Sequence, residues 1–359
     1  MTVPSTMRGV VLTGHGGLDK LDYREDLPVP APGPDEVLIE VAACGMNNTD
    51  INTRTGWYSK EVTGATGVGV ADADDDGSWG GGLAFPRVQG ADPAGRIVAV
   101  GSGVSGKRVG ERVIVDSWLR DPGGDLEKAR YLGSELDGGY AEYVVVPSAS
   151  ATAIDTDLTD VELASFSCSY STAEHMLHRA GVSAGQWVLV TGASGGVGSG
   201  LVQLAKRRGA SVVAIAGEGK LDAVSAFGAD VVIARQEPDV AAAVRDAVGR
   251  VDVFADVVGG TNFAPLLELV KRGGHYTTAG AIAGPIVDLD LRTLYLNDLT
   301  LHGATVLPPV VFANLVGYIE RGEIRPVVGA SYPLREIAEA QTAFMEKQHV
   351  GAIVMEVAR

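Results

Sequence analysis

The chain has 359 residues, of which 46% are hydrophobic and 21% are charged, which is typical of a globular protein with a large apolar core. The formal net charge of −16 would repel a phosphate backbone, so we expect no nucleic-acid partner. We find no apolar run of about 18 residues that could span a membrane and no secretory signal at the start, and two cysteines cannot form a disulfide framework. These features together favour a cytoplasmic protein with no membrane partner.

The first third of the chain predicts short strands between glycine and proline turns. β-branched runs closed by such turn residues occur at 7–14, 36–45, 94–103, 111–117 and 139–147. This spacing indicates a compact antiparallel domain that resembles a β-barrel.

From about Leu158 the pattern changes to alternating helices and strands. A helix is expected over 160–181, then strands at 187–192, 210–217 and 230–235 that alternate with helices at 197–209 and 220–228. The segments 239–249, 251–259, 263–274, 275–280 and 299–306 continue the alternation. Strands that are apolar throughout predict a parallel sheet covered on both faces. The apolar run 351–357 is expected to be a strand that pairs back into the first domain.

One stretch, residues 60–86, is rich in glycine and aspartate and has little periodicity. A solvated surface loop accounts for this composition. A loop of this length in a compact domain can also be a lid over a site. The sequence leaves both interpretations open.

The strongest chemical signal is the glycine-rich turn after the strand at 187–192. Glycines recur at three-residue spacing, at Gly192, Gly195 and Gly198, between a buried strand and a helix that starts near Val197. Small residues there let the backbone approach a pyrophosphate, and the helix N-terminus faces its negative charge. We therefore expect a dinucleotide-binding site that includes Gly192, Ala193, Ser194, Gly195, Gly196, Val197 and Gly198.

The next strand bears on which dinucleotide binds. NAD sites usually have an acidic residue at its end that binds the ribose hydroxyls, and Gly217 occupies this position. Lys220 follows within reach of a 2′-phosphate, which favours NADP. A shift of one residue would make Glu218 the ribose ligand, so NAD remains the alternative.

These blocks resemble the medium-chain dehydrogenase/reductases. The resemblance rests on "PGPDEVLIEVAACGMNNTDINTRTG", "GADPAGRIVAVGSGVSGKRVGERV", "GGYAEYVVVP", "TGASGGVGSGLVQLAKRRGA" and "GGHYTTAG", which occur in the family's order. It implies an α/β protein with a GroES-like β-barrel catalytic domain at 1–157, completed by 308–359, and a Rossmann domain with a doubly wound parallel sheet at 158–307, with a cleft between them. It also implies that Thr172, Gly259, Thr278, Ala279 and Gly280 border the cofactor.

Zinc enzymes of this family hold the metal with three side chains, and the resemblance places those positions at Asn47, Ala91 and Cys168. Only the last is a ligand residue, and zinc needs three donors and an open position. We therefore expect no zinc, and we expect Cys44 to be a buried residue near the end of a strand. An atypical site built from Cys168, Asp92 and a histidine is the alternative.

Without zinc, the sequence is most similar to the quinone oxidoreductases and enone reductases of the family. This implies hydride transfer from NADPH to a small-molecule quinone or α,β-unsaturated carbonyl. Asn47 is expected to donate a hydrogen bond to the substrate oxygen, Thr49 to relay a proton, and Tyr58 to act as an acid. The apolar strand 299–306 predicts a homodimer. The alternatives are an alcohol dehydrogenase with an atypical zinc site and a non-enzymatic NADP(H)-binding protein.

Overall fold

The computed structural model describes residues 3–68 and 83–357, and the chain divides into two compact units. Unit 1 comprises residues 1–62, 67–168 and 326–359, and unit 2 comprises residues 63–66 and 169–325. The expected domains and these units differ in their assignment of residues 63–66, 158–168 and 308–325. Residues 69–82 of the Gly/Asp-rich stretch lie outside the described part, so its expected character as a loop or lid stays a prediction.

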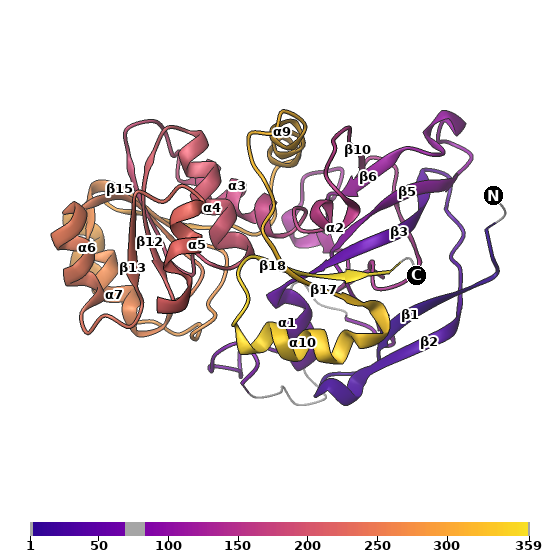
Figure 1. Cartoon of the computed structure of the whole chain (residues 1–359), viewed down its shortest axis with the longest axis horizontal. Helices are drawn as coiled ribbons and strands as arrows, with labels where there is room; N and C mark the ends of the chain where they lie inside the picture. The colour runs from indigo at the N-terminus through magenta and orange to yellow at the C-terminus, as the bar shows by residue number, and fades with distance from the viewer. Residues whose placement is uncertain (1–2, 69–82, 358–359) are drawn as a thin grey trace. The chain divides into compact units, whose positions relative to one another are not determined.

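Unit 1 is a mainly antiparallel β structure, as the sequence predicted (Figure 1). Its main sheet has the order β10-β6-β5-β3-β18-β17, with β9 also pairing with β3, and β2-β1-β4 and β7-β8 form smaller sheets. The strands are β1 (Thr6–Leu12), β2 (Leu21–Pro28), β3 (Glu36–Met46), β4 (Arg87–Val88), β5 (Asp92–Val100), β6 (Arg112–Val115), β7 (Trp118–Leu119), β8 (Arg130–Tyr131), β9 (Tyr143–Pro147), β10 (Ala151–Ala153), β17 (Val328–Pro333) and β18 (Ala352–Glu356).

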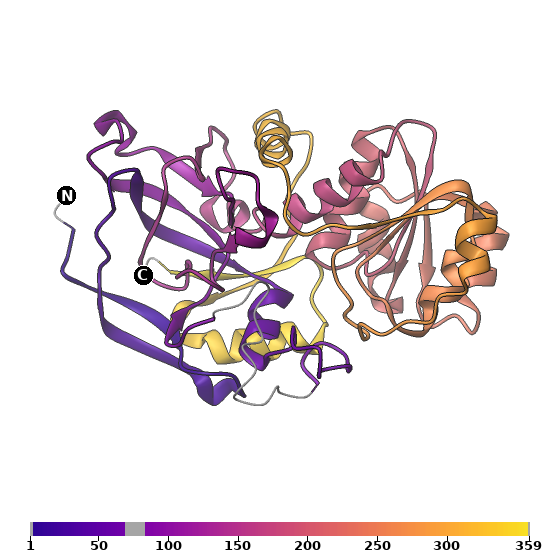
Figure 2. The same cartoon turned by 180° about the vertical axis from the view of Figure 1, so that it is seen from behind.

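The long strand β3 lies at the centre of unit 1, because it pairs with β5, β9 and β18. Its residue Cys44 is fully buried, as the sequence predicted. The C-terminal strand β18 pairs antiparallel with β3, with Val354 opposite Gly45, which confirms that the segment 351–357 returns to this part of the protein (Figure 2). The helices of unit 1 are α1 (Asn48–Thr55), α2 (Asp160–Leu163) and α10 (Ile337–Glu346), and α10 packs on β17 and β18.

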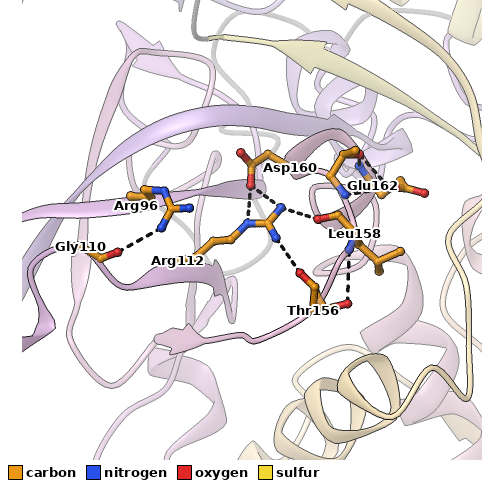
Figure 3. A network of polar contacts seen from close by, with 8 residues as sticks. Arg96, Gly110, Arg112, Thr156, Leu158, Asp160 and Glu162 are labelled. Atoms are coloured by element: carbon orange, nitrogen blue, oxygen red, sulfur yellow. Dashed lines mark hydrogen bonds and ion pairs between the residues drawn. The ribbon is translucent and has the colours of Figure 1, made fainter.

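A single arginine fastens the segment that leads into α2 (Figure 3). The Arg112 guanidinium donates to the Asp160 carboxylate (2.7 Å), the Thr156 carbonyl (3.1 Å) and the Leu158 carbonyl (2.6 Å). Because one planar group satisfies three acceptors, it holds residues 156–160 against β6. Nearby, Arg96 of β5 donates to the Gly110 carbonyl (3.2 Å) in the turn before β6.

Unit 2 is the doubly wound parallel sheet that the sequence predicted, which confirms the α/β fold class. The strand order is β13-β12-β11-β14-β15-β16, with every pair parallel. Helices α3, α4 and α5 pack on one face and α6 and α7 on the other (Figure 1). The elements are α3 (Ser169–Arg179), β11 (Trp187–Val190), α4 (Gly196–Arg207), β12 (Ser211–Ala216), α5 (Leu221–Ala226), β13 (Val231–Ala234), α6 (Val240–Val248), β14 (Val251–Asp256), α7 (Phe263–Leu267), β15 (Val270–Thr278), α8 (Leu291–Leu296), β16 (Thr300–Gly303) and α9 (Pro309–Glu320).

The structure corrects two details of the expected elements. The single helix expected over 160–181 is interrupted at residues 164–168, where the Cys168 N–H donates to the Asp92 carboxylate. Strand β15 begins at Val270, ahead of the expected strand at 275–280. None of the helices formed by the described residues is long and apolar enough to cross a membrane.

Candidate cofactor and catalytic sites

The glycine-rich turn lies at the carboxyl end of β11, where the strand order of unit 2 reverses between β11 and β14. Gly192 has a φ of +60°, a conformation that favours glycine. A Cβ on Gly198 would lie 2.1 Å from the carbonyl oxygen of Gly192, so only glycine lets α4 pack this closely on the turn. Both predicted glycines are therefore required by the backbone itself.

The N-terminus of α4 is suited to bind an anion. The helix begins at Gly196 with Gly195 as its N-cap, and no side chain caps it. Its first N–H groups and its positive dipole end therefore remain for a phosphate. The Ala193 N–H donates to the Ile215 carbonyl (3.1 Å), which fixes the turn against β12, and the half-buried Ser194 and Val197 complete it.

Helix α3 borders the same turn. A Cβ on Gly196 would lie 2.5 Å from the Ser169 hydroxyl oxygen, so the two helices meet closely there. The predicted residue Thr172 lies one turn further along α3 and is half-buried. These residues together fit the pyrophosphate of a dinucleotide.

Asp256, at the end of β14, is a residue that the sequence analysis did not identify. Its buried carboxylate accepts hydrogen bonds from the Thr191 and Tyr276 hydroxyls and from the Val258 (2.9 Å) and Gly259 N–H groups. It therefore ties together the ends of β11, β14 and β15. The acidic residue at the carboxyl end of the strand 251–256 was the signal in the sequence that could have identified it.

The residues expected beside the nicotinamide lie at the same carboxyl edge. Gly259 follows β14 with a φ of +63°, and Thr278, Ala279 and Gly280 follow one another at the end of β15. The Thr278 hydroxyl donates to the Gly280 carbonyl (3.1 Å). Since β14 and β15 are paired neighbours, these residues form one continuous rim beside the glycine-rich turn.

Two cations lie at the end of β12. Gly217 directly follows that strand, and Lys220 is half-buried just beyond it. Burial together with the nearby Arg235 charge lowers the pKa of Lys220. Arg235 follows β13, and its backbone N–H donates to the Ala216 carbonyl (2.7 Å). The sequence analysis missed Arg235, because β13 lies beside β12 only in the folded sheet. The Glu218 side chain is exposed.

In unit 1, Asn47 is buried at the junction between β3 and α1. Its N–H donates to the Asp50 carboxylate (2.8 Å), which also accepts from the Tyr140 hydroxyl (3.0 Å). Its Nδ2 donates to the Asp92 carboxylate (3.0 Å). Burial raises the pKa of Asp50 to about 6 and that of Asp92 to about 8.

The other two predicted catalytic residues contact each other. The polar side chains of Thr49 and Asn52 both act to lower the pKa of Tyr58, so they stabilise its phenolate form. Burial has the larger effect and raises the pKa of Tyr58 above its usual range. Tyr58 is therefore held in the protonated form that a proton donor needs, although it is a weaker acid than an ordinary tyrosine.

The donor set at the three expected zinc positions does not fit a catalytic zinc. Asn47 presents an amide nitrogen to Asp92, and Ala91 offers only a buried methyl group. Cys168 is a single possible thiolate ligand, whereas zinc needs three donors and an open position. Among the residues that the structure describes, no group of three or more His, Cys, Asp or Glu side chains could hold a metal ion.

Comparison with known families assigns both halves of the chain. Residues 33–156 match the alcohol dehydrogenase GroES-like domain, and residues 196–321 match the zinc-binding dehydrogenase family. The chain is 29% identical to the quinone oxidoreductase of Homo sapiens over 93% of this chain and 92% of that protein.

Two solved structures are also similar along their whole length. One, described as a candidate alcohol dehydrogenase from Sinorhizobium meliloti 1021, is 51% identical with a TM-score of 0.91 over 99% of this chain and 98% of that one. The other, an NAD-dependent alcohol dehydrogenase, is 31% identical with a TM-score of 0.87 over 98% of this chain and 100% of that one. The GroES-like and Rossmann expectations are therefore confirmed, and the chain belongs to the medium-chain dehydrogenase/reductase superfamily as a nicotinamide-dependent oxidoreductase.

Proposed function

We propose that this chain is an NADPH-dependent reductase that transfers a hydride to a quinone or an α,β-unsaturated carbonyl without a catalytic zinc. The hydrogen bond from Asn47 Nδ2 to Asp92 is the main support for this proposal. Asn47 stands where related enzymes have a zinc ligand, and its amide is bonded to a carboxylate instead. An amide N–H can stabilise a developing oxyanion but is no Lewis acid. An acceptor that already contains an electron sink therefore suits this site best.

The polar contacts within unit 1 support a catalytic role for each of three side chains, those of Asn47, Tyr58 and Thr49. When bound, a reduced nicotinamide supplies the hydride, so the acceptor gains two electrons and must also gain one proton. Asn47 Nδ2 donates to the acceptor oxygen as charge develops there. Tyr58 donates the proton, and Thr49, which stabilises the phenolate, relays a replacement proton to it from solvent water.

NADP is the proposed cofactor, with NAD as the alternative. Lys220 and Arg235 form a pair of cations beside Gly217, where the 2′-phosphate of NADP binds in this kind of sheet. A phosphate between two cations relieves their mutual repulsion and accepts hydrogen bonds from both. The similar NAD-dependent alcohol dehydrogenase and the exposed Glu218 support the alternative.

We also propose that two copies form a homodimer through β16. This strand is the last in the sheet order, and Leu301 on it is 37% exposed. The preceding helix α8 exposes Leu291, Tyr295 and Leu296. An edge strand with an exposed leucine, preceded by a helix with exposed apolar side chains, is a surface that a second copy can cover.

Alcohol dehydrogenase activity is the second candidate, since the Sinorhizobium meliloti structure carries that description. The non-enzymatic alternative is set aside, because the chain is an oxidoreductase of this superfamily.

Zinc content and substrate preference, measured on one preparation, distinguish the two candidates. Purified protein is offered NADPH with 1,4-benzoquinone, an enone or an aldehyde, and separately NADP⁺ with a simple alcohol. We expect zinc well below one ion per chain, NADPH oxidation with quinone or enone, and no loss of rate with a chelator. One zinc per chain, with alcohol oxidation that the chelator abolishes, would overturn the proposal.

A further inference from the structure

Asp92 connects three segments of unit 1 that are far apart in the sequence. One carboxylate oxygen accepts the Cys168 N–H (2.7 Å), and the other accepts Asn47 Nδ2 (3.0 Å). The residue itself opens β5 and is only 1% exposed. Asp92 therefore fixes the β3–α1 junction relative to β5 and to the segment before α3.

The surrounding backbone is shaped to admit this carboxylate. A Cβ on Gly45, opposite Asp92 in the β3–β5 ladder, would lie 2.9 Å from the carboxylate and 2.2 Å from the Ala164 carbonyl oxygen. The Ser117 hydroxyl donates to the carbonyl of Ala91 and holds the neighbouring peptide. Asp92 is thus in contact with β3 because position 45 carries no side chain.

Burial of the Asp92 carboxyl is also unfavourable for the stability of the fold. Within the described ranges no lysine or arginine forms an ion pair or hydrogen bond with Asp92, and the buried Asp50 adds like charge. Burying an acid without a cation is unfavourable for folding. An apolar residue at this position would leave Asn47 Nδ2 and the Cys168 N–H without their acceptor, so the carboxyl is the group that holds both.

We propose that Asp92 is a positioning residue that holds the Asn47 amide in place to receive the substrate oxygen. The inference rests on the proposed function of Asn47. A carboxyl can hold both neighbours in either protonation state, since a protonated one can donate to the amide oxygen of Asn47 while its other oxygen accepts from Cys168. Displacing a donor by a fraction of a bond length removes much of its effect on the transition state.

A double-mutant cycle between Asn47 and Asp92 tests this inference. Asn47→Ala should lower kcat with a quinone by about 10²-fold, as the loss of one oxyanion donor does elsewhere. Asp92→Ala should lower kcat by roughly 10- to 100-fold through misplacement of the amide. The double variant should be no slower than Asn47→Ala, because a positioning residue has no effect once the group it positions is absent.

The conservative variant Asp92→Asn should stay within roughly threefold of the wild-type kcat, because its amide can still bond both neighbours. The control is Asp116→Ala, which removes another buried carboxyl of unit 1 that pairs with Arg120 and does not contact Asn47. It should lower Tm and leave kcat unchanged. If Asp92→Ala does not fold, Asp92→Ser replaces it, since its hydroxyl is too short to reach both neighbours.

The outcomes separate the inference from the proposed function. Losses from Asn47→Ala and Asp92→Ala that multiply in the double variant would show that Asp92 acts independently of Asn47, which overturns the positioning role. An Asp92→Asn variant as slow as Asp92→Ala would also overturn it. If Asn47→Ala retains full kcat, the proposed function of Asn47 itself is wrong.

Discussion

At the residue scale, Lys220 and Arg235 provide the clearest test of cofactor choice. If they bind a 2′-phosphate, Lys220→Ala and Arg235→Ala should each raise the KM for NADPH by about tenfold, which corresponds to about 1.4 kcal/mol of lost binding. The KM for NADH should change by less than about twofold, because NADH carries no phosphate there. Steady-state kinetics with both cofactors measures the effect.

Two controls accompany these variants. Lys107→Ala removes an exposed lysine in unit 1 and should affect neither cofactor, which excludes a general effect of net charge. Glu218→Ala tests the alternative, since a ribose ligand would be lost and the KM for NADH would rise. Equal losses with NADPH and NADH in the Lys220 and Arg235 variants would contradict phosphate binding.

A second residue-scale prediction concerns pH. Burial raises the pKa of Asp50 to about 6 and of Asp92 to about 8, whereas an aspartate in an unfolded chain titrates near 3.9. Between about pH 4 and pH 8 the folded state therefore binds more protons than the unfolded state. Its free energy of unfolding must then fall as pH rises through this window, as far as these two groups contribute.

Asp92→Asn removes one of these groups, so its free energy of unfolding should decline less than that of the wild type between pH 5.5 and pH 8.5. Urea unfolding at several pH values measures both curves. Asp290→Asn is the control. In the wild type Arg292 lowers the pKa of the Asp290 carboxyl, so this group titrates below the window and its removal should leave the stability curve parallel to that of the wild type. Parallel curves for Asp92→Asn and wild type would show that its pKa is not raised.

The sequence identified the residues of the glycine-rich turn, because their spacing lies within one strand–turn–helix segment. It did not reveal that Asn47 bonds to Asp92, because 45 positions separate the two residues and only strand pairing brings them together. Arg235 was missed for the same reason. The spacing of residues along the chain thus predicts a binding turn formed by consecutive residues. Contacts between residues on different strands become visible only in the folded structure.

At the element scale, the packing of α4 on the end of β11 makes Gly198 and Gly195 a useful pair to compare, because only one of them has room for a side chain. A Cβ on Gly198 would meet backbone atoms at 2.1 and 2.6 Å, whereas one on Gly195 has its nearest neighbour at 3.6 Å. Gly198→Ala should therefore destabilise the fold by about 1–3 kcal/mol and displace the helix N-terminus. Gly195→Ala should leave Tm near the wild-type value and weaken only cofactor binding, where the pyrophosphate approaches.

Thermal unfolding and cofactor titration on both variants separate these effects. A Gly198→Ala variant with wild-type Tm and wild-type NADPH affinity would contradict this prediction, because α4 could then move without affecting the glycine-rich turn.

The elements themselves were predictable where apolar periodicity was strong, as in the strands and helices of unit 2. The interruption at residues 164–168 was not, because no proline or glycine lies within 160–180 to mark it. Helix α2 ends at Leu163, and within the turn that follows the Cys168 N–H bonds to Asp92 instead of to a carbonyl of the preceding turn. A tertiary hydrogen bond of this kind overrides local preference.

At the scale of the whole molecule, assembly must overcome a net charge of −16 on each copy. Two such copies repel each other, and salt weakens this repulsion, whereas apolar contacts across β16 and α8 do not depend on charge. A dimer held by that surface should therefore dissociate less readily as ionic strength rises from about 20 to about 200 mM. Over this range the Debye length falls to about the length of a side chain, so the repulsion between the two copies is screened.

Leu301→Lys tests the assembly directly, because a lysine on an edge strand opposes pairing with another strand. Leu301 is 37% exposed on β16, and sedimentation should show the wild type as a dimer and this variant as a monomer at micromolar concentration. The control Leu126→Lys places the same charge at an apolar residue of unit 1 that is 66% exposed, and it should remain dimeric. A wild type that sediments as a monomer, or a Leu301→Lys variant that dimerises as tightly as the wild type, would exclude β16 as the interface.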